Sequence, residues 1–199
     1  NQYKNSKLNL NYARSDAESF SKIMDDKTSP LFKNIELKTL YDQDATRQKI
    51  LATLDEMASK ISQEDVFIFY YAGHGSMVDN RFFFIPTEGV RLYDAGALNK
   101  EAIEATLLQE KFKHIKALKQ LIIMDACQSG ASVELLAARG ANEEKAIAQL
   151  SRSAGIHVMA SAGSDQFAAE FSVLGHGVFT DVLLRALQGE ADGAPKDGK

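Results

Sequence analysis

A cysteine and a histidine occupy positions from which a nucleophile and its base could meet. Cys127, the single cysteine of the chain, follows the apolar run Leu121–Met124, and His74 follows the apolar run Val66–Tyr71. If these runs are parallel strands of an open α/β sheet, their carboxyl ends meet at one edge. A free thiol is only a few per cent ionised at neutral pH, so it needs an adjacent imidazole to act as a nucleophile. The pair predicts cysteine-based nucleophilic catalysis.

The segment around His74 also contains Gly73 and Gly75. Because glycines let a backbone approach a substrate closely, we expect the amides of Gly75 and Cys127 to donate to a developing oxyanion. Each residue also has a plainer interpretation when it is taken alone. Cys127 would be a small buried hydrophobic residue, and His74 would be an ordinary turn residue.

The local sequence motifs are similar to those of a known enzyme family. Asp125-Ala126-Cys127-Gln128-Ser129-Gly130, with a histidine upstream in Tyr71-Ala72-Gly73-His74-Gly75, resembles the caspase signature, whose histidine lies about 50 residues before the cysteine. Weaker matches are Phe83-Phe84-Ile85-Pro86 and Gly175-His176-Gly177-Val178-Phe179-Thr180. The chain thus resembles the caspase-like cysteine peptidases, and bacterial caspase homologues and metacaspases more than animal caspases. The resemblance implies a three-layer α/β fold with a largely parallel central sheet flanked by helices.

Two carboxylates are candidates for the pocket that holds the residue before the scissile bond. The resemblance to metacaspases implies this role for Asp16, in the first predicted helix, and for Asp125, two positions before the cysteine. Two acids can hold a guanidinium by charge-assisted hydrogen bonds, so we expect cleavage after Arg or Lys. Alternatively, Asp16 is a solvated helix charge and Asp125 only caps a turn. Ala72 is a further expected substrate contact.

Later segments carry additional predictions. The resemblance implies a substrate-binding loop that contains Asp165 and Glu170, which are otherwise plain loop charges. It also implies a linker, residues 131–155, that is cut during activation. Given a basic preference, the candidate self-cleavage sites are Arg139, Lys145 and Arg152. The alternative for this linker is a surface helix.

Apolar periodicity predicts alternating helices and strands. Helices are expected over residues 11–25, 44–61, 101–109 and 177–188, and strands over 35–40, 66–71, 81–85, 120–125 and 156–161. By resemblance, a single peptidase domain, residues 1–188, divides into a large-subunit-like part (1–130), the linker and a small-subunit-like part (156–188). Residues 189–199 are expected to be a flexible tail or the start of a linker. A first and a last strand are expected to lie outside the sequence.

Composition narrows the classes of function. With 199 residues, of which 45% are hydrophobic, the chain is long enough for one sizeable core. A net charge of −4 gives no footprint for nucleic acid. One cysteine cannot form an internal disulfide and suits a reducing compartment. No apolar run approaches the ~20 residues that span a membrane and no signal peptide is visible, so we expect a cytoplasmic location.

We expect no required metal or other cofactor. The spacing of His and Cys is not a zinc pattern. Calcium activation, which the resemblance to metacaspases associates with a longer acid-rich stretch than residues 77–81, is not favoured, although Glu88, Asp94 and Glu134 could supply oxygen ligands. The expected partner is a protein or peptide with a basic residue before the scissile bond, together with further domains or partner proteins.

The remaining histidines are weaker base candidates than His74. His157 lies inside a predicted strand, His176 in a turn where helix capping is commoner than catalysis, and His114 among lysines. Two other functions stay open. One is a catalytically silent caspase-like binding or scaffold module, and the other is a separase-like peptidase within a larger multidomain protein.

Overall fold

Helices and strands alternate along the chain. The computed structural model describes residues 1–79, 81–89, 91–92, 94–127, 156–161 and 175–192. The helices are α1 (Ala13–Thr28), α2 (Arg47–Lys60), α3 (Ala95–Glu101), α4 (Ala105–His114) and α6 (Val178–Arg185). The strands are β1 (Val66–Val78), β2 (Arg81–Ile85), β3 (Ile103–Glu104), β4 (Lys119–Cys127) and β5 (Ile156–Ala160). Short 3-10 turns cover Ser6–Leu8 and Asp42–Asp44, and a π-helical turn covers Ala186–Glu190.

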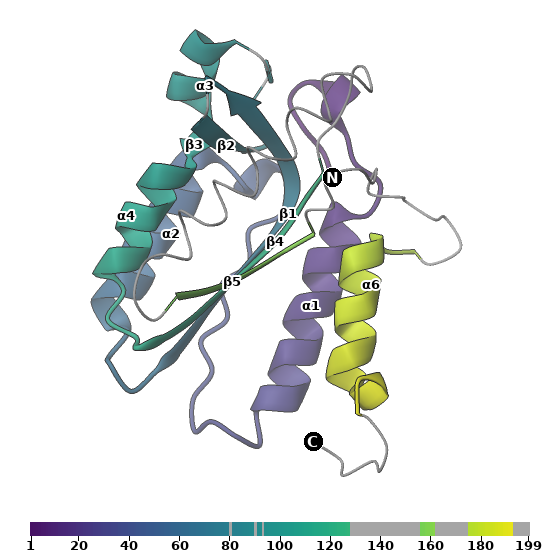
Figure 1. Ribbon diagram of the computed structural model, residues 1–199, viewed down its shortest axis with the longest axis vertical. Coiled ribbons are helices and arrows are strands. Elements are labelled where there is room, and N and C mark those ends of the chain that lie inside the picture. The colour runs from purple at the N-terminus through teal and green to yellow at the C-terminus, as the bar shows by residue number, and fades with distance from the viewer. Residues whose placement is uncertain (80, 90, 93, 128–155, 162–174, 193–199) are drawn as a thin grey trace.

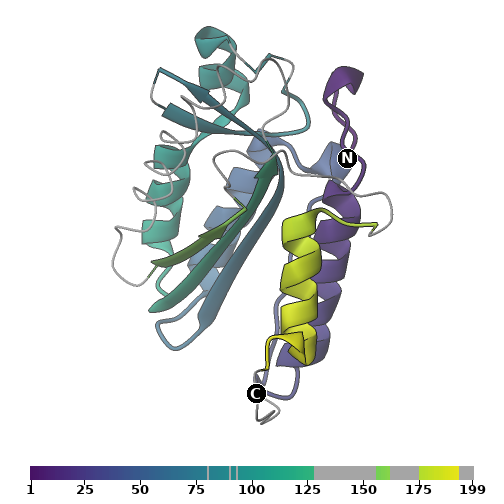
Figure 2. The ribbon, with the colours of Figure 1, turned by 45° about the vertical axis from the view of Figure 1, so that its right-hand side comes forward.

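The described strands form one mixed sheet in the order β3-β2-β1-β4-β5. β1, β4 and β5 run parallel, whereas β2 and β3 are antiparallel to their neighbours. Helices α2 and α4 cover one face of the sheet, and α1 and α6 lie side by side on the other (Figures 1 and 2). This arrangement confirms the expected three-layer α/β architecture.

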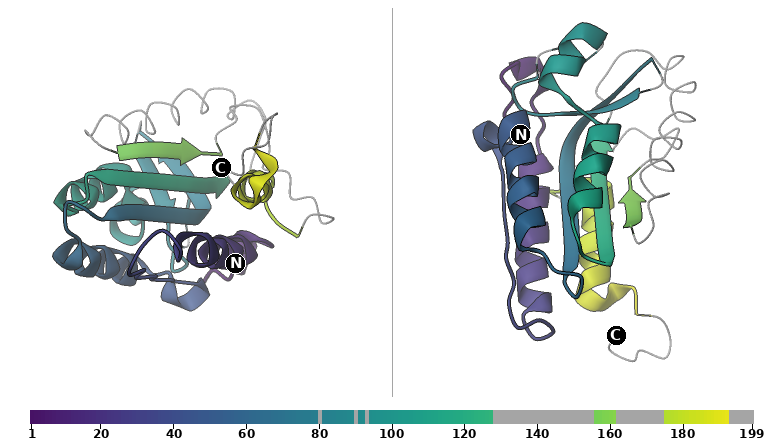
Figure 3. Two further views of the ribbon diagram at one scale, coloured as in Figure 1. Left: turned by 90° about the horizontal axis from the view of Figure 1, so that it is seen from below. Right: turned by 90° about the vertical axis from the view of Figure 1, so that its left-hand side faces the viewer.

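The apolar core lies between the sheet and the pair α2 and α4, which stand together in Figure 3. Phe67 of β1 and Ile122 of β4 face Phe112 of α4, whose ring lies 6.0 Å from that of Phe67. Gln120 donates from Nε2 to three carbonyls near the end of α4, those of Phe112, Ile115 and Ala117. The side chain of Gln120 thus satisfies backbone groups where α4 turns into β4.

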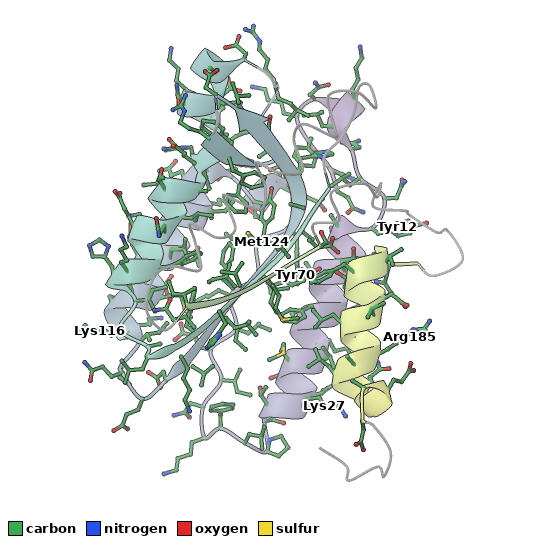
Figure 4. The ribbon with its side chains drawn as sticks, viewed as in Figure 1. Tyr12, Lys27, Tyr70, Lys116, Met124 and Arg185 are labelled. Carbon is green, nitrogen blue, oxygen red and sulfur yellow. The ribbon has the colours of Figure 1, made fainter. Side chains whose placement is uncertain are left out.

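On the opposite face, α1 packs against β1. The ring of Phe20 stacks on that of Tyr70, with the centroids 4.4 Å apart. Figure 4 labels Tyr70, which points from the sheet toward α1. Successive residues of a strand point to opposite faces. Phe67 and Tyr70 therefore contact different layers, and the alternation fixes which side chains of β1 and β4 face α1 and α6.

Capping side chains explain where two of the helices begin. Thr46 accepts a hydrogen bond from the backbone N–H of Lys49 at 3.2 Å and so starts α2, close to the start predicted from the sequence. Asp94 accepts from the backbone N–H of Ala97 at 3.0 Å and starts α3, a helix that the sequence analysis did not predict.

Four predicted elements differ from the structure. Residues 35–40 are extended but form no strand, because no described strand pairs with them. The helix predicted over 101–109 begins only at Ala105 and continues to His114, since Ile103–Glu104 pair with β2 instead. β1 continues beyond residue 71 to Val78, because β2 folds back on it. In the predicted tail, residues 189–190 belong to a helical turn, and residues 193–199 lie outside the described residues.

We predict that Gly75→Ala destabilises the fold. A Cβ at this position of β1 would lie 2.4 Å from Cζ of Phe82, an overlap that Phe82, packed in the core, cannot easily relieve. Overpacking of this kind costs about 1–3 kcal/mol of unfolding free energy, measurable by urea denaturation. The matched test combines the substitution with Phe82→Leu, which removes part of the ring and should recover much of the loss in a double-mutant cycle. Additive effects of the two substitutions would contradict the overlap.

Candidate active site

The parallel pairing of β1 with β4 ends at the pair His74 and Cys127. Two residues earlier, Ala72 pairs with Asp125 in the same register. Paired strands lie about 4.8 Å apart, so the backbone positions of the predicted dyad are direct neighbours. The strand predicted to end at residue 71 continues past His74, so the histidine does not follow the strand and is not an ordinary turn residue. His74 lies within β1, held between Cys127 of β4 and Ile85 of β2.

The His74 side chain is buried, with 1% of the residue exposed, and its orientation is fixed by a backbone carbonyl. Nε2 lies 2.7 Å from the carbonyl oxygen of Leu8. A carbonyl only accepts hydrogen bonds, so Nε2 carries the proton in this contact. In the neutral ring, Nδ1 is then the nitrogen with the lone pair and hence the basic atom.

The segment before α1 holds this histidine in place. Leu8 closes a 3-10 turn that Asn5 caps by accepting from the N–H of Lys7, and its side chain packs with Phe83 and Ile85. The Tyr3 hydroxyl accepts from the backbone N–H of His74 at 3.2 Å, and its ring lies 5.0 Å from the imidazole. The carbonyl that sets the tautomer is therefore part of a packed turn.

Asp16 of α1 and Asp125 of β4 converge on the residue before α6. The exposed fractions are 3% for Asp16 and 6% for Asp125, so Asp16 is not the solvated helix charge considered as an alternative. A Cβ on Gly177 would lie 3.1 Å from Oδ2 of Asp16 and 3.2 Å from Oδ2 of Asp125. The two carboxylates thus face the same point, and a Cβ at position 177 would require both to shift by a few tenths of an ångström.

Each buried carboxylate has its own donors. Asp16 Oδ1 is 2.8 Å from His176 Nδ1, and the Gly177 N–H lies 3.2 Å from both Asp16 oxygens. Asp125 Oδ2 accepts from the Thr180 hydroxyl at 2.7 Å, and the Tyr70 hydroxyl lies 2.6 Å from that of Thr180. Because Thr180 donates to the carboxylate, its oxygen accepts the proton of Tyr70. A hydrogen-bonded chain thus joins β1, α6 and β4.

The environment of Asp16 makes its carboxylate easier to protonate than an exposed one. Burial raises the pKa of Asp16 from 3.8 to about 6, the nearby charge of Asp125 acts in the same direction, and the hydrogen bonds from His176 and Gly177 oppose the shift. A buried acid beside a second acid favours a cation in its surroundings. The pair can therefore bind a basic group.

Gly75 directly follows His74 in β1 and pairs with Phe84 of β2. The other histidines considered as bases are not gathered at this site, since His157 is exposed on β5 and His114 is exposed at the end of α4. Asp165, Glu170, Glu134 and the predicted cleavage sites Arg139, Lys145 and Arg152 lie outside the described residues.

The residues considered for calcium lie at separate helix starts. Glu88 accepts from the backbone N–H of Arg47 in α2, and Asp94 caps α3. Within the described part of the chain, no three His, Cys, Asp or Glu side chains are grouped so that they could hold a metal ion.

Sequence reasoning missed three contributors to this site. The carbonyl of Leu8 has no residue-type signature, because every residue has one. Thr180 and Tyr70 were available only as members of apolar helix and strand patterns, although Thr180 is completely buried and hydroxyl groups in such positions need partners. His176 was considered as a weak base or a capping residue, and its pairing with Asp16 could not be anticipated from a separation of 160 positions.

Comparison with known proteins found one matching family model and similar solved structures. The family model described as the caspase domain of C14 peptidases matches residues 1–196. A solved structure, that of protein GSU0716 from Geobacter sulfurreducens, superimposes with a TM-score of 0.63 at 17% sequence identity, covering 90% of this chain and 73% of that one. No curated protein sequence matches the chain. None of the helices in the described residues has the length and apolar character needed to cross a membrane.

We predict that Asp16→Asn changes how stability depends on pH. Since folding raises the Asp16 pKa to about 6, the stabilisation from binding this proton is complete below pH 3.8 and is lost as the pH rises through about 6. Asparagine does not titrate, so the unfolding free energy of the variant should gain about 2–3 kcal/mol on wild type between pH 3.5 and 7.5. Urea denaturation at several pH values measures this difference. Parallel pH profiles for the two proteins would contradict the buried acid.

Proposed function

Because this chain belongs to the caspase-domain family of peptidases, we propose that it is a cysteine endopeptidase that cleaves proteins after Arg or Lys. The observation that supports this most strongly is the register of β1 and β4, which pairs the backbone of Cys127 with that of His74. The hydrogen bond from His74 Nε2 to the Leu8 carbonyl leaves Nδ1 as the basic nitrogen. The family supports a cysteine peptidase in general, and the residue roles and basic preference are our proposal.

In the proposed reaction, His74 Nδ1 takes the proton of the Cys127 thiol as the sulfur attacks the carbonyl carbon of the scissile bond. The amides of Gly75 and Cys127 stabilise the negative oxygen that forms. His74 then gives its proton to the leaving amine, and the C–N bond breaks. A water molecule, deprotonated by the same imidazole, hydrolyses the thioester and restores the thiol.

The carbonyl of Leu8 supports this proton transfer. When His74 becomes doubly protonated, the Nε2–H bond to an acceptor at 2.7 Å stabilises the positive charge. The same bond prevents the ring from rotating. We propose that the reaction uses no metal or organic cofactor, since imidazole and backbone amides supply each step.

Asp16 and Asp125 form the proposed pocket for the basic residue. The side chain of the residue before the scissile bond must lie near the nucleophile, and Asp125 is two residues from Cys127 on one strand. A guanidinium or ammonium group would compensate the negative charges of the two buried carboxylates. An aspartate side chain, which is itself negative, would be repelled by them. This charge argument supports cleavage after Arg or Lys.

We predict rapid release of a fluorophore from peptides that end in Arg or Lys and none from a matched Asp peptide. Cys127→Ala should abolish turnover. Asp125→Asn should lower kcat/KM for the Arg peptide by about 100-fold, because a hydrogen bond to a charged group is worth up to about 3 kcal/mol.

The control is Asp55→Asn, which removes an exposed carboxylate on α2 that pairs with Lys111 and should leave turnover unchanged. Added calcium is also expected to leave turnover unchanged. Cleavage after Asp and not after Arg would overturn the proposed pocket. An absence of turnover with every peptide would favour a binding or scaffold module.

We also propose self-processing within residues 131–155. A basic preference makes Arg139, Lys145 and Arg152 the expected sites. Mass spectrometry of the incubated wild-type protein should show two fragments that separate after one of these residues, whereas Cys127→Ala should keep its intact mass. Equal intact masses for both proteins would rule out self-processing.

A further inference from the structure

In the structure, the two carboxylates of the proposed pocket already contact other residues of the chain. With exposed fractions of 3% and 6%, neither Asp16 nor Asp125 is open to a side chain from outside. A substrate group can reach them only if a segment moves. The segment that contacts both acids is the turn of residues 175–177, which leads into α6.

This turn is attached to α1 by a small number of polar contacts. The shortest is the 2.8 Å contact between His176 Nδ1 and Asp16. The others, all at 3.2 Å, are the bonds from the Gly177 N–H to Asp16 and a contact of the Ser15 hydroxyl with the Gly175 carbonyl. The single Ser15 proton is shared with the Tyr12 carbonyl, which lies closer, at 2.8 Å. The His176 side chain is 23% exposed, and Gly175 has a φ of +68° with open space around its Cβ position. The outer side of the turn is therefore unobstructed by described atoms.

The helix after the turn is anchored more firmly. Thr180 is completely buried and bonded to Asp125 and Tyr70, and Leu184 is buried further along α6. Among the described residues, the charged or titratable groups that act on the Asp16 carboxylate are His176 in the turn and Asp125 on β4. Gly177 belongs to this anchored part, because its carbonyl accepts from the backbone N–H of Asp181 at 2.9 Å. A rearrangement confined to the His176 side chain would leave α6 and Asp125 in place.

We propose that His176 is an internal counter-ion of the acidic pair, and that a basic substrate side chain binds by displacing it from Asp16. This inference rests on the proposed function, because it concerns the same pocket. The exchange keeps the buried carboxylate hydrogen-bonded: the imidazole N–H donor leaves Asp16, and a guanidinium or ammonium N–H donor takes its place. His176 is then a specificity-determining residue, because it competes with every basic ligand.

The test uses the full chain and a small probe, acetyl-arginine methylamide, with acetyl-citrulline methylamide as the neutral isostere. Binding measured by calorimetry should be detectable for the arginine compound alone. His176→Gln keeps a hydrogen-bond donor without the charge, and it should bind the arginine probe about 3–10-fold more tightly than wild type. His176→Lys places a permanent cation beside Asp16 and should bind it at least 10-fold more weakly.

Ser15→Ala is the matched control, since it removes a contact of the same turn without touching Asp16. Its affinity should stay within about twofold of wild type. If His176→Gln, folded by circular dichroism, binds no more tightly than Ser15→Ala, the turn is only a structural cap and the proposal is overturned. On the unmodified chain, the histidine ring signals in NMR offer a second readout: the His176 signal should shift on addition of the arginine probe, and an unchanged signal at saturation would also overturn it.

This experiment does not depend on the thiol. If arginine peptides are not cleaved while His176→Gln still gains affinity for the probe, the proposed peptidase function is contradicted and the proposed displacement of His176 is supported. If cleavage occurs and the affinity does not change, only the proposed displacement of His176 is contradicted. In the cleavage assay, His176→Gln should lower KM for the Arg peptide and leave kcat within about twofold, a split that general destabilisation of the fold would not produce.

Discussion

The parallel register of β1 and β4 is the constraint on which the rest of the site depends. It pairs His74 with Cys127 and, two residues earlier, Ala72 with Asp125. A slip by one residue would separate the first pair and turn every side chain of the strand to the other face of the sheet. The register is protected by packing on both faces, since Phe67 fits the core beneath α4 and Phe20 of α1 stacks on the opposite face.

The same register directs the Asp125 carboxylate toward α1 and α6, where Asp16 also lies. Burying these two carboxylates together is energetically unfavourable by itself. Two acids with little access to water repel each other and lose their hydration. A helix start such as that of α6 needs only one acceptor for its N–H groups, and serine or threonine would supply it without a charge. A second buried acid is therefore more than the start of α6 requires, which supports the binding role that we propose for the pair.

The sequence was informative where a residue type or a period identifies a role. Strands β1 and β4 could be predicted because continuous apolar runs are typical of strands buried on both faces. The pairing of His74 with Cys127 could be predicted because each residue comes after such a run, whereas their roles as a catalytic dyad stay a prediction. The strand predicted over residues 35–40 was wrong because alternating polarity shows only that a segment can form a strand. A strand also needs a neighbouring strand with which to pair. The roles of the Leu8 carbonyl and of the bond from Thr180 to Asp125 could not be predicted for another reason. They depend on contacts between residues far apart in the sequence, which local patterns do not contain.

The two acids have different donors, and in our proposal this difference makes Asp125 the fixed member of the pair and Asp16 the exchangeable one. Asp125 is held by Thr180, a neutral, fully buried donor on an anchored helix and itself bonded to Tyr70. Asp16 is held by a partly exposed imidazole and by one N–H at 3.2 Å. Arg and Lys differ in length and in the shape of their charged ends, and one fixed carboxylate together with one that changes partners would accommodate both, which is the requirement that our proposal sets. The unequal bonding of Asp125 and Asp16 meets this requirement, and it reconciles their contacts with α6 and their proposed role toward substrate.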